Sequence, residues 1–278
     1  IFSLLRSRFG QVIRLREHFR CMPEIISWCS NSFYRDAPLV PLRQFGADRL
    51  PPLRATYVEG GFTEGTGSRA ANVAEAEEIA AALAACLADE AYDGLSFGVV
   101  VLQGQAQVEI IASALKRVID PEEWDRRRIR VGTPPEFQGD ERNVVFLSMV
   151  VAPKERAAFP FTKRDAEQRF NVAVSRAQDQ LWLFHSVTAD LLRPTDLRRS
   201  LLDHMTSGAG AELPPVLADV TRTRELNGRK WSTPAESHCT HSIDGALSSR
   251  SSRGKGAPIL PLSTTVGSNW RSTSPSAS

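Results

Sequence analysis

The 278-residue chain has few cysteines and no long run of apolar residues. Its four cysteines, Cys21, Cys29, Cys86 and Cys239, form no C-x-x-C pair. This argues against a disulfide scaffold or a zinc ribbon and favours a reducing compartment. No apolar run approaches the roughly 18 residues that a membrane-spanning helix needs, and arginines interrupt the apolar residues at the start. These absences predict a cytoplasmic protein without a membrane partner.

The chain also lacks the sequence patterns of several enzyme classes. It contains no G-x-x-x-x-G-K-[ST] loop, no apolar strand that ends in an Asp-Glu pair, and no G-x-S-x-G elbow. The first two patterns hold the phosphates and the metal ion in nucleotide hydrolases, so a nucleotide site here would be incomplete. His238, Cys239 and His241 could bind a metal, but such a group in a Ser-rich segment is more often incidental. We therefore expect no metal site.

The composition changes sharply near Ser207. Before it, apolar segments recur regularly, whereas after it Ser, Thr, Gly, Pro and Arg predominate. Such a composition buries too little apolar surface to offset the entropy lost on ordering. We expect a folded domain over residues 1–206 and a mostly disordered tail without strands over residues 207–278. A net charge of +2 neither demands nor excludes a nucleic-acid partner.

Within residues 1–206, the apolar pattern predicts strands that alternate with helices. Short apolar runs predict strands over residues 53–58, 97–102, 129–132, 143–151 and 181–186. Helical patterns cover residues 23–34, 70–91, 105–119 and 191–205. Because helices fall between most strands, the connections should be right-handed crossovers and the sheet mostly parallel. We predict an α/β fold whose ligands gather at the carboxyl ends of the strands.

Three polar segments should fall near that edge. They cover residues 15–24, 131–141 and 169–176. They overlap the motif segments Phe19-Arg20-Cys21-Met22-Pro23, Phe137-Gln138-Gly139-Asp140-Glu141 and Asn171-Val172-Ala173-Val174-Ser175-Arg176-Ala177. Arg169 and Arg176 lie seven residues apart, on either side of a small apolar helical stretch. Guanidinium groups on a rigid element suit a phosphate, because each offers a planar fork of donors that stays charged. Each segment alone is weak evidence, whereas their order and spacing are specific.

In this order the segments resemble motifs IV, V and VI of superfamily 1 helicases, in the group related to Upf1 and Dna2. Residues 100–107 are weakly similar to the strand-and-Gln segment between motifs IV and V. The resemblance covers residues 1–205 and implies the second RecA-like (AAA) domain of such a helicase, with a three-layer P-loop NTPase fold. The chain departs from the family at Cys21-Met22-Pro23, where Met-His-Pro is usual. It also departs at Thr133-Pro134-Pro135-Glu136, where a carboxylate is lost.

The resemblance implies a nucleotide site shared with another domain. Arg20 and Arg176 would act as arginine fingers on the γ-phosphate of ATP. Gln138 and Gly139 would place polar and backbone groups in the cleft between domains, and Glu141 would lie near the nucleotide sugar. ATP and Mg²⁺ would be bound mainly by a preceding RecA-like domain.

The resemblance also implies contacts with single-stranded DNA or RNA. The hydroxyl of Thr133 would touch a nucleic-acid phosphate, and Arg169 would contact the strand or be structural. Two of the implied roles have simpler alternatives. Thr133 could cap the short helix that follows it, and Glu141 could pair with Arg142 or Arg128 on the surface.

These features predict the C-terminal motor domain of an ATP-dependent DNA or RNA helicase, as part of a longer protein. Because the phosphate loop and the metal-binding carboxylate are absent, we expect no ATP hydrolysis by this chain alone. The alternative is a non-catalytic helicase relic that binds a partner or nucleic acid. A phosphate loop in the sequence upstream would favour the motor over the relic.

Overall fold

The computed structural model describes residues 2–10, 13–152, 160–206, 224–226 and 229–231. The chain divides into two units, residues 1–235 and 236–278, and the second lies outside the described residues. His238, Cys239 and His241 therefore lie outside them as well.

The described part of the predicted tail contains a pair of short antiparallel strands. These are β8 (Arg224–Leu226) and β9 (Arg229–Trp231). The prediction of no strand after residue 206 is therefore wrong at these positions. The sequence Asn227-Gly228 stands between the two strands, and this dipeptide is a strong hairpin signal because it favours the tight turn that antiparallel strands need. The rest of residues 207–278 lies outside the described residues.

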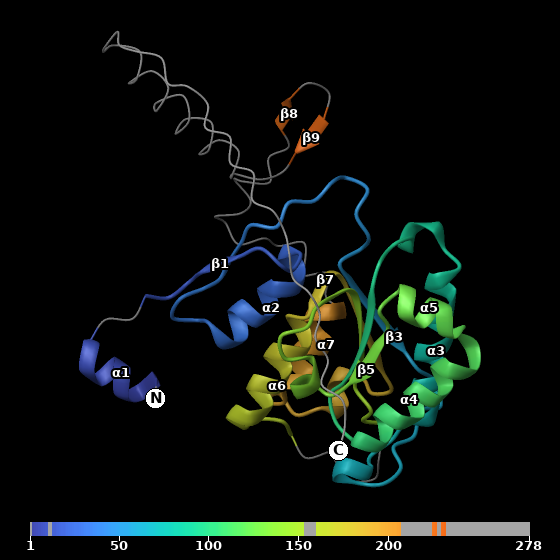
Figure 1. Ribbon diagram of the computed structural model, residues 1–278. Helices are drawn as coiled ribbons and strands as arrows, with labels where there is room; N and C mark the ends of the chain where they lie inside the picture. Colours follow the sequence, from blue (N-terminus) through green and yellow to red (C-terminus); the bar gives the residue numbers. More distant parts are fainter. Residues whose placement is uncertain (1, 11–12, 153–159, 207–223, 227–228, 232–278) are drawn as a thin grey trace, which may run out of the picture. The chain divides into compact units, whose positions relative to one another are not determined.

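A five-stranded sheet forms the centre of residues 1–206 (Figure 1). Its spatial order is β3-β7-β6-β4-β5, and every neighbouring pair is parallel. The strands are β3 (Leu53–Tyr57), β4 (Phe97–Val101), β5 (Arg130–Gly132), β6 (Arg142–Ser148) and β7 (Ala177–His185). The predicted α/β fold with a parallel sheet is confirmed. β7 begins earlier than predicted, because Gln180 is buried and hydrogen-bonds Tyr92 Oη at 3.0 Å, so polar side chains continue the strand.

Helices cover both faces of the sheet, which gives three layers (Figure 1). One face packs against α2 (Pro23–Phe33), α6 (Arg164–Val174) and α7 (Leu197–Thr206). The other packs against α3 (Val73–Leu87) and α4 (Gln105–Val118). Along β6, Val145 and Leu147 belong to the first core, whereas Val144 and Phe146 belong to the second. A strand that is apolar on both faces is typical of a parallel sheet buried between helices.

The remaining described elements are short. They are α1 (Phe2–Phe9), β1 (Glu17–His18) paired in parallel with β2 (Val40–Pro41), α5 (Pro121–Arg126), and 3₁₀ helices over Gly67–Arg69, Glu90–Tyr92, Pro134–Phe137 and Ala189–Leu191. α3 is shorter than predicted because Asn72 caps its start, where its side chain accepts a hydrogen bond from the backbone N–H of Glu75 at 3.2 Å. None of the described helices combines the length and apolar character needed to cross a membrane.

Candidate functional site

The predicted site residues lie at two opposite edges of the sheet. Glu141 directly precedes β6 and Arg176 directly precedes β7, so both lie at the amino ends of their strands, and Arg20 pairs with Glu141 there. Thr133 follows β5 and Arg169 reaches the chain just beyond β4, so these two lie at the carboxyl edge. The prediction that the three clusters fall near the carboxyl edge therefore holds for Thr133 and Arg169 and is wrong for Arg20, Glu141 and Arg176. A residue that immediately precedes a parallel strand must lie at its amino end.

Arg20 and Glu141 form an ion pair at the amino edge. Nε of Arg20 donates to Oε2 of Glu141, and Nε2 of Gln178 donates to the other carboxylate oxygen at 2.7 Å. The two side chains are 36% and 43% exposed, so solutes can reach the pair. Glu141 therefore does not form the surface pair with Arg142 that the sequence left open, because the Arg142 guanidinium pairs with Asp140 instead.

Arg176 lies beside Arg20 with part of its donor capacity unused. Its Nη1 donates to the carbonyl oxygen of Asp140 at 3.2 Å, whereas its Nε is buried without a hydrogen-bond partner among the described residues. Burial lowers the pKa of Arg176, and the positive charge of Arg20 lowers it further. Two adjacent guanidinium groups, one with an unfilled donor, form a site that favours an anion.

A ring of polar contacts connects this ion pair to residues that sequence reasoning missed. Arg43 donates to the carbonyl oxygen of Arg20 and pairs with Asp179. Asn143 donates to Asp179 at 2.8 Å and to Gln178 at 3.2 Å, which leads back to the ion pair. The run Gln178-Asp179-Gln180 directly after motif VI was the available signal, since polar residues at a strand start need partners.

We call Arg20, Arg43, Glu141, Arg176 and Gln178 the amino-edge cluster. Except for Arg176, these residues line a shallow cavity of about 400 Å³. His18 lines it too, but burial first and the charge of Arg20 second lower the pKa of His18 to about 4. Its Nε2 accepts a hydrogen bond from the Cys21 backbone N–H at 3.1 Å. A neutral His18 near pH 7 therefore leaves the positive charge of the cluster to the arginines.

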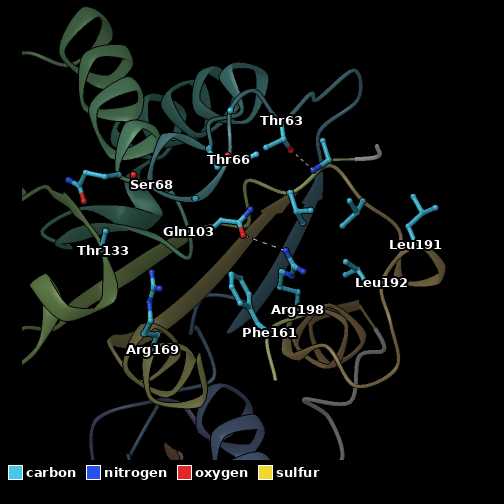
Figure 2. A pocket seen from close by; sticks show the side chains of 18 of the residues that line it. Thr63, Thr66, Ser68, Gln103, Thr133, Phe161, Arg169, Leu191, Leu192 and Arg198 are labelled. Atoms are coloured by element: carbon cyan, nitrogen blue, oxygen red, sulfur yellow. Dashed lines mark hydrogen bonds between the residues drawn. The ribbon is translucent and has the colours of Figure 1, made fainter. Parts of the chain in front are cut away.

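A larger cavity, of about 1050 Å³, lies at the carboxyl edge (Figure 2). We call it the carboxyl-edge cavity. Its polar side chains include Thr66, Ser68, Gln103, Gln105, Thr133 and Arg169. Its apolar side chains include Val151, Phe161, Val187, Leu191 and Leu192. Donor groups beside an apolar wall suit a ligand that carries both negative charge and flat apolar surfaces.

Arg169 and Thr133 enter this cavity from α6 and from the end of β5. Nη2 of Arg169 donates to the carbonyl oxygen of Leu102 at 3.2 Å, while its Nε is buried and has no hydrogen-bond partner in the described part of the chain. The Thr133 hydroxyl and backbone N–H both donate to the Glu136 carboxylate, at 2.7 and 2.6 Å. These bonds lower the pKa of Glu136. Thr133 therefore caps the 3₁₀ helix Pro134–Phe137 and also lines the cavity.

Gln138 and Gly139 lie in the exposed loop between Phe137 and Glu141. Gly139 has φ +86° and open space around it, so a glycine suits this turn. Among the described residues, the Gln138 side chain makes no hydrogen bond to the amino-edge cluster. The described chain also contains no group of three or more His, Cys, Asp and Glu residues that could hold a metal ion.

Parts of this chain are similar to known proteins. A family model described as an AAA domain matches residues 1–187. A Mycoplasma genitalium protein named as an uncharacterized ATP-dependent helicase is 24% identical over 195 residues, which cover 66% of this chain and 17% of that protein. The chain thus spans less than a fifth of the length of this curated relative.

The solved C-terminal domain of a possible DNA helicase from Lactobacillus plantarum is 17% identical, with a TM-score of 0.37. The match covers 65% of this chain and 96% of that domain. The family match extends over more than half of the 278 residues. The chain therefore belongs to this AAA-domain family, in agreement with the resemblance of its motifs to the C-terminal domain of superfamily 1 helicases.

Proposed function

We propose that this chain is the C-terminal motor domain of an ATP-dependent helicase that acts on single-stranded DNA or RNA, within a longer protein. The observation that carries the proposal is the separation of two arginine-bearing sites at opposite edges of one sheet. A motor must bind a nucleotide and a strand at the same time, so it needs two such surfaces. The name of the Mycoplasma relative supports the same activity.

At the amino-edge cluster, Arg20 and Arg176 are the proposed arginine fingers. Their guanidinium groups fit a terminal phosphate for two reasons. Arg176 has a buried donor without a partner among the described residues, and Arg20 already binds an anionic carboxylate, whose place a phosphate oxygen can take. ATP would be held mainly by another RecA-like domain with Mg²⁺, and negative charge would develop on its terminal phosphate during cleavage. On binding, Arg20 would exchange the Glu141 carboxylate for a phosphate oxygen, and Glu141 would become free to accept from a sugar hydroxyl. Gln138 and Gly139 form the exposed loop beside this exchange.

At the carboxyl-edge cavity, Arg169 and Thr133 are the proposed strand contacts. Arg169 supplies the charge that attracts phosphates, and its buried Nε is an unfilled donor. The apolar wall supplies surfaces on which bases can pack without sequence preference. Binding at this edge leaves the amino edge open to the nucleotide.

An ATPase assay on the purified 278-residue chain tests the proposal. With Mg²⁺, ATP and single-stranded oligonucleotide present, we expect turnover no higher than the background, because the chain lacks a phosphate loop. In parallel, the chain should bind a fluorescent oligonucleotide with an affinity that falls as salt rises. Robust turnover would refute the proposal that the nucleotide site is divided between this chain and another domain. Absence of oligonucleotide binding at low salt would refute the strand site.

A further inference from the structure

A buried ion pair stands at the wall of the carboxyl-edge cavity, and its Arg198 is one of the lining residues. Arg198 and Asp196 are each 1% exposed, and Nη2 of Arg198 lies 2.6 Å from Oδ2 of Asp196. Both residues follow residue 187, where the family match ends. Replacing a buried ion pair by apolar residues is often neutral or stabilising, so stability alone is a weak reason for its presence.

Within this lining, Arg198 contacts Gln103, which lies just beyond the carboxyl end of β4. Nη1 of Arg198 donates to Oε1 of Gln103 at 3.5 Å (Figure 2), and the guanidinium carbon lies 4.6 Å from the centre of the Phe161 ring. Asp196 holds Arg198 from the other side and also accepts a hydrogen bond from the Arg198 backbone N–H at 3.0 Å, at the start of α7. Arg198 is therefore fixed on more than one side.

The contact determines which end of the Gln103 amide meets Arg198. A guanidinium carries donors and no acceptor, so the amide oxygen of Gln103 must face it. The NH₂ group is then left for another partner, and among the described residues it donates no hydrogen bond. We propose that the Arg198–Asp196 pair orients Gln103 so that its NH₂ group donates to a phosphate oxygen of a single nucleic-acid strand in the cavity.

The rest of the cavity favours a phosphodiester over a cationic or neutral ligand. Arg169 contributes positive charge, and Ser68 and Thr66 contribute hydroxyl groups, whereas Asp190 is the acidic residue of the lining. A volume of about 1050 Å³ exceeds the size of one phosphate and accommodates part of a strand. This inference rests on the proposed function, because it identifies a further contact and a positioning pair for the same strand site.

A charge-matched pair of variants tests the donor role of Gln103. Gln103→Glu keeps the length of the side chain and an oxygen for Arg198, but replaces the NH₂ donor by a second oxygen. Gln105→Glu introduces the same charge into the same cavity lining, at an exposed residue that begins α4. Binding of fluorescent oligo(dT) and oligo(U) by the full chain is measured by anisotropy at several salt concentrations. We expect Gln103→Glu to weaken binding roughly tenfold more than Gln105→Glu does.

A double-mutant cycle tests the positioning role of the ion pair. Asp196→Asn with Arg198→Met removes both charges and keeps a side chain that can cap α7. We expect Gln103→Ala to weaken binding by roughly tenfold in the natural chain and by less than about twofold in this background. If the pair had only a structural role, Gln103→Ala would weaken binding by the same factor in the natural chain and in this background. If thermal melting shows that the background does not fold, Arg198→Lys replaces it, because lysine keeps the charge beside Asp196 and lacks the second nitrogen that reaches Gln103.

The outcomes separate this inference from the proposed function. If the natural chain does not bind the oligonucleotides, both fail. If it binds them in a salt-dependent way while Gln103→Glu and Gln105→Glu have equal effects, or while the cycle shows no coupling, the function stands and the inference is overturned. Displacement of the oligonucleotide by inorganic phosphate at constant ionic strength would assign the cavity to a small anion and would also overturn it.

Discussion

At the scale of single residues, Glu75 is the buried acid that supports one wall of the carboxyl-edge cavity. Its Oε1 accepts hydrogen bonds from the Ser148 hydroxyl at 2.6 Å and from the Val150 backbone N–H at 2.9 Å. Val150 has φ +67°, a conformation that a β-branched residue rarely adopts and that costs free energy. Glu75 thus holds a strained turn next to Val151, which lines the cavity.

Burial raises the pKa of Glu75 to about 8, although its hydrogen bonds act in the opposite direction. In the unfolded chain this carboxyl ionises near pH 4.5, so between about pH 4.5 and 8 the folded state binds the extra proton. The contribution of Glu75 to stability is therefore fully present below pH 4.5 and is lost as the pH rises toward 8. Relative to Glu75→Gln, the free energy of unfolding of the natural chain should fall by on the order of 5 kcal/mol across this window.

Urea denaturation at several pH values between 5 and 8 measures this difference. Glu77→Gln is the matched control, because it removes the same charge from the same helix at an exposed position. Its pH dependence should follow that of the natural chain. A Glu75→Gln variant whose stability changes with pH as much as that of the natural chain would show that Glu75 is ionised in the folded state.

At the scale of elements, the junction between β4 and α4 depends on Gly104. This residue has φ +84°, and a Cβ placed on it would lie 2.0 Å from the carbonyl oxygen of Ala70. Gly104→Ala should therefore lower the free energy of unfolding by about 3 kcal/mol or more, because it combines backbone strain with overpacking against backbone.

Gly94 offers the control for this prediction. Its φ of +73° is similar, but no atom lies within 4 Å of the Cβ that alanine would add. Gly94→Ala should cost about 1 kcal/mol, which reports the backbone term alone. Chemical denaturation of both variants measures the difference. Equal losses would mean that the close approach to Ala70 relaxes freely.

The position of α6 explains why two arginines of one sequence segment lie at opposite edges of the sheet. Arg169 lies within this helix, whereas Arg176 lies just beyond its end and directly before β7. The helix advances about 7.5 Å from Arg169 to its last residue, Val174, and the chain then enters β7, so the two arginines contact different edges of the sheet. Arg169 contacts the chain beyond β4, and Arg176 contacts Asp140 before β6.

At the scale of the whole molecule, apolar pattern was sufficient to predict the sheet. Runs such as Phe97–Val101 are fully buried, and such runs between helical patterns indicate parallel strands. The polar start of β7 was missed, because its side chains are satisfied by long-range partners such as Tyr92 that sequence does not show.

The site was only partly predictable for the same reason. The motifs selected Arg20 and Arg176, which the fold places together at the amino edge. The rule used for their placement, that ligands gather at the carboxyl ends of parallel strands, did not predict this edge. Arg43 carries no local signal, since its partners Arg20 and Asp179 are far away in the sequence. Contacts of this kind follow from the fold rather than from any segment.

We propose that Arg176 contacts the nucleotide and Arg169 the nucleic-acid strand, at opposite edges of one sheet. The most direct test compares Arg176→Ala with Arg169→Ala in the longer protein that contains this chain. ATP turnover at saturating oligonucleotide and oligonucleotide affinity are measured for both variants. We expect Arg176→Ala to lower kcat by roughly 10³-fold with little change in affinity, and Arg169→Ala to weaken affinity roughly tenfold with little change in kcat. Unchanged turnover in Arg176→Ala would contradict the account.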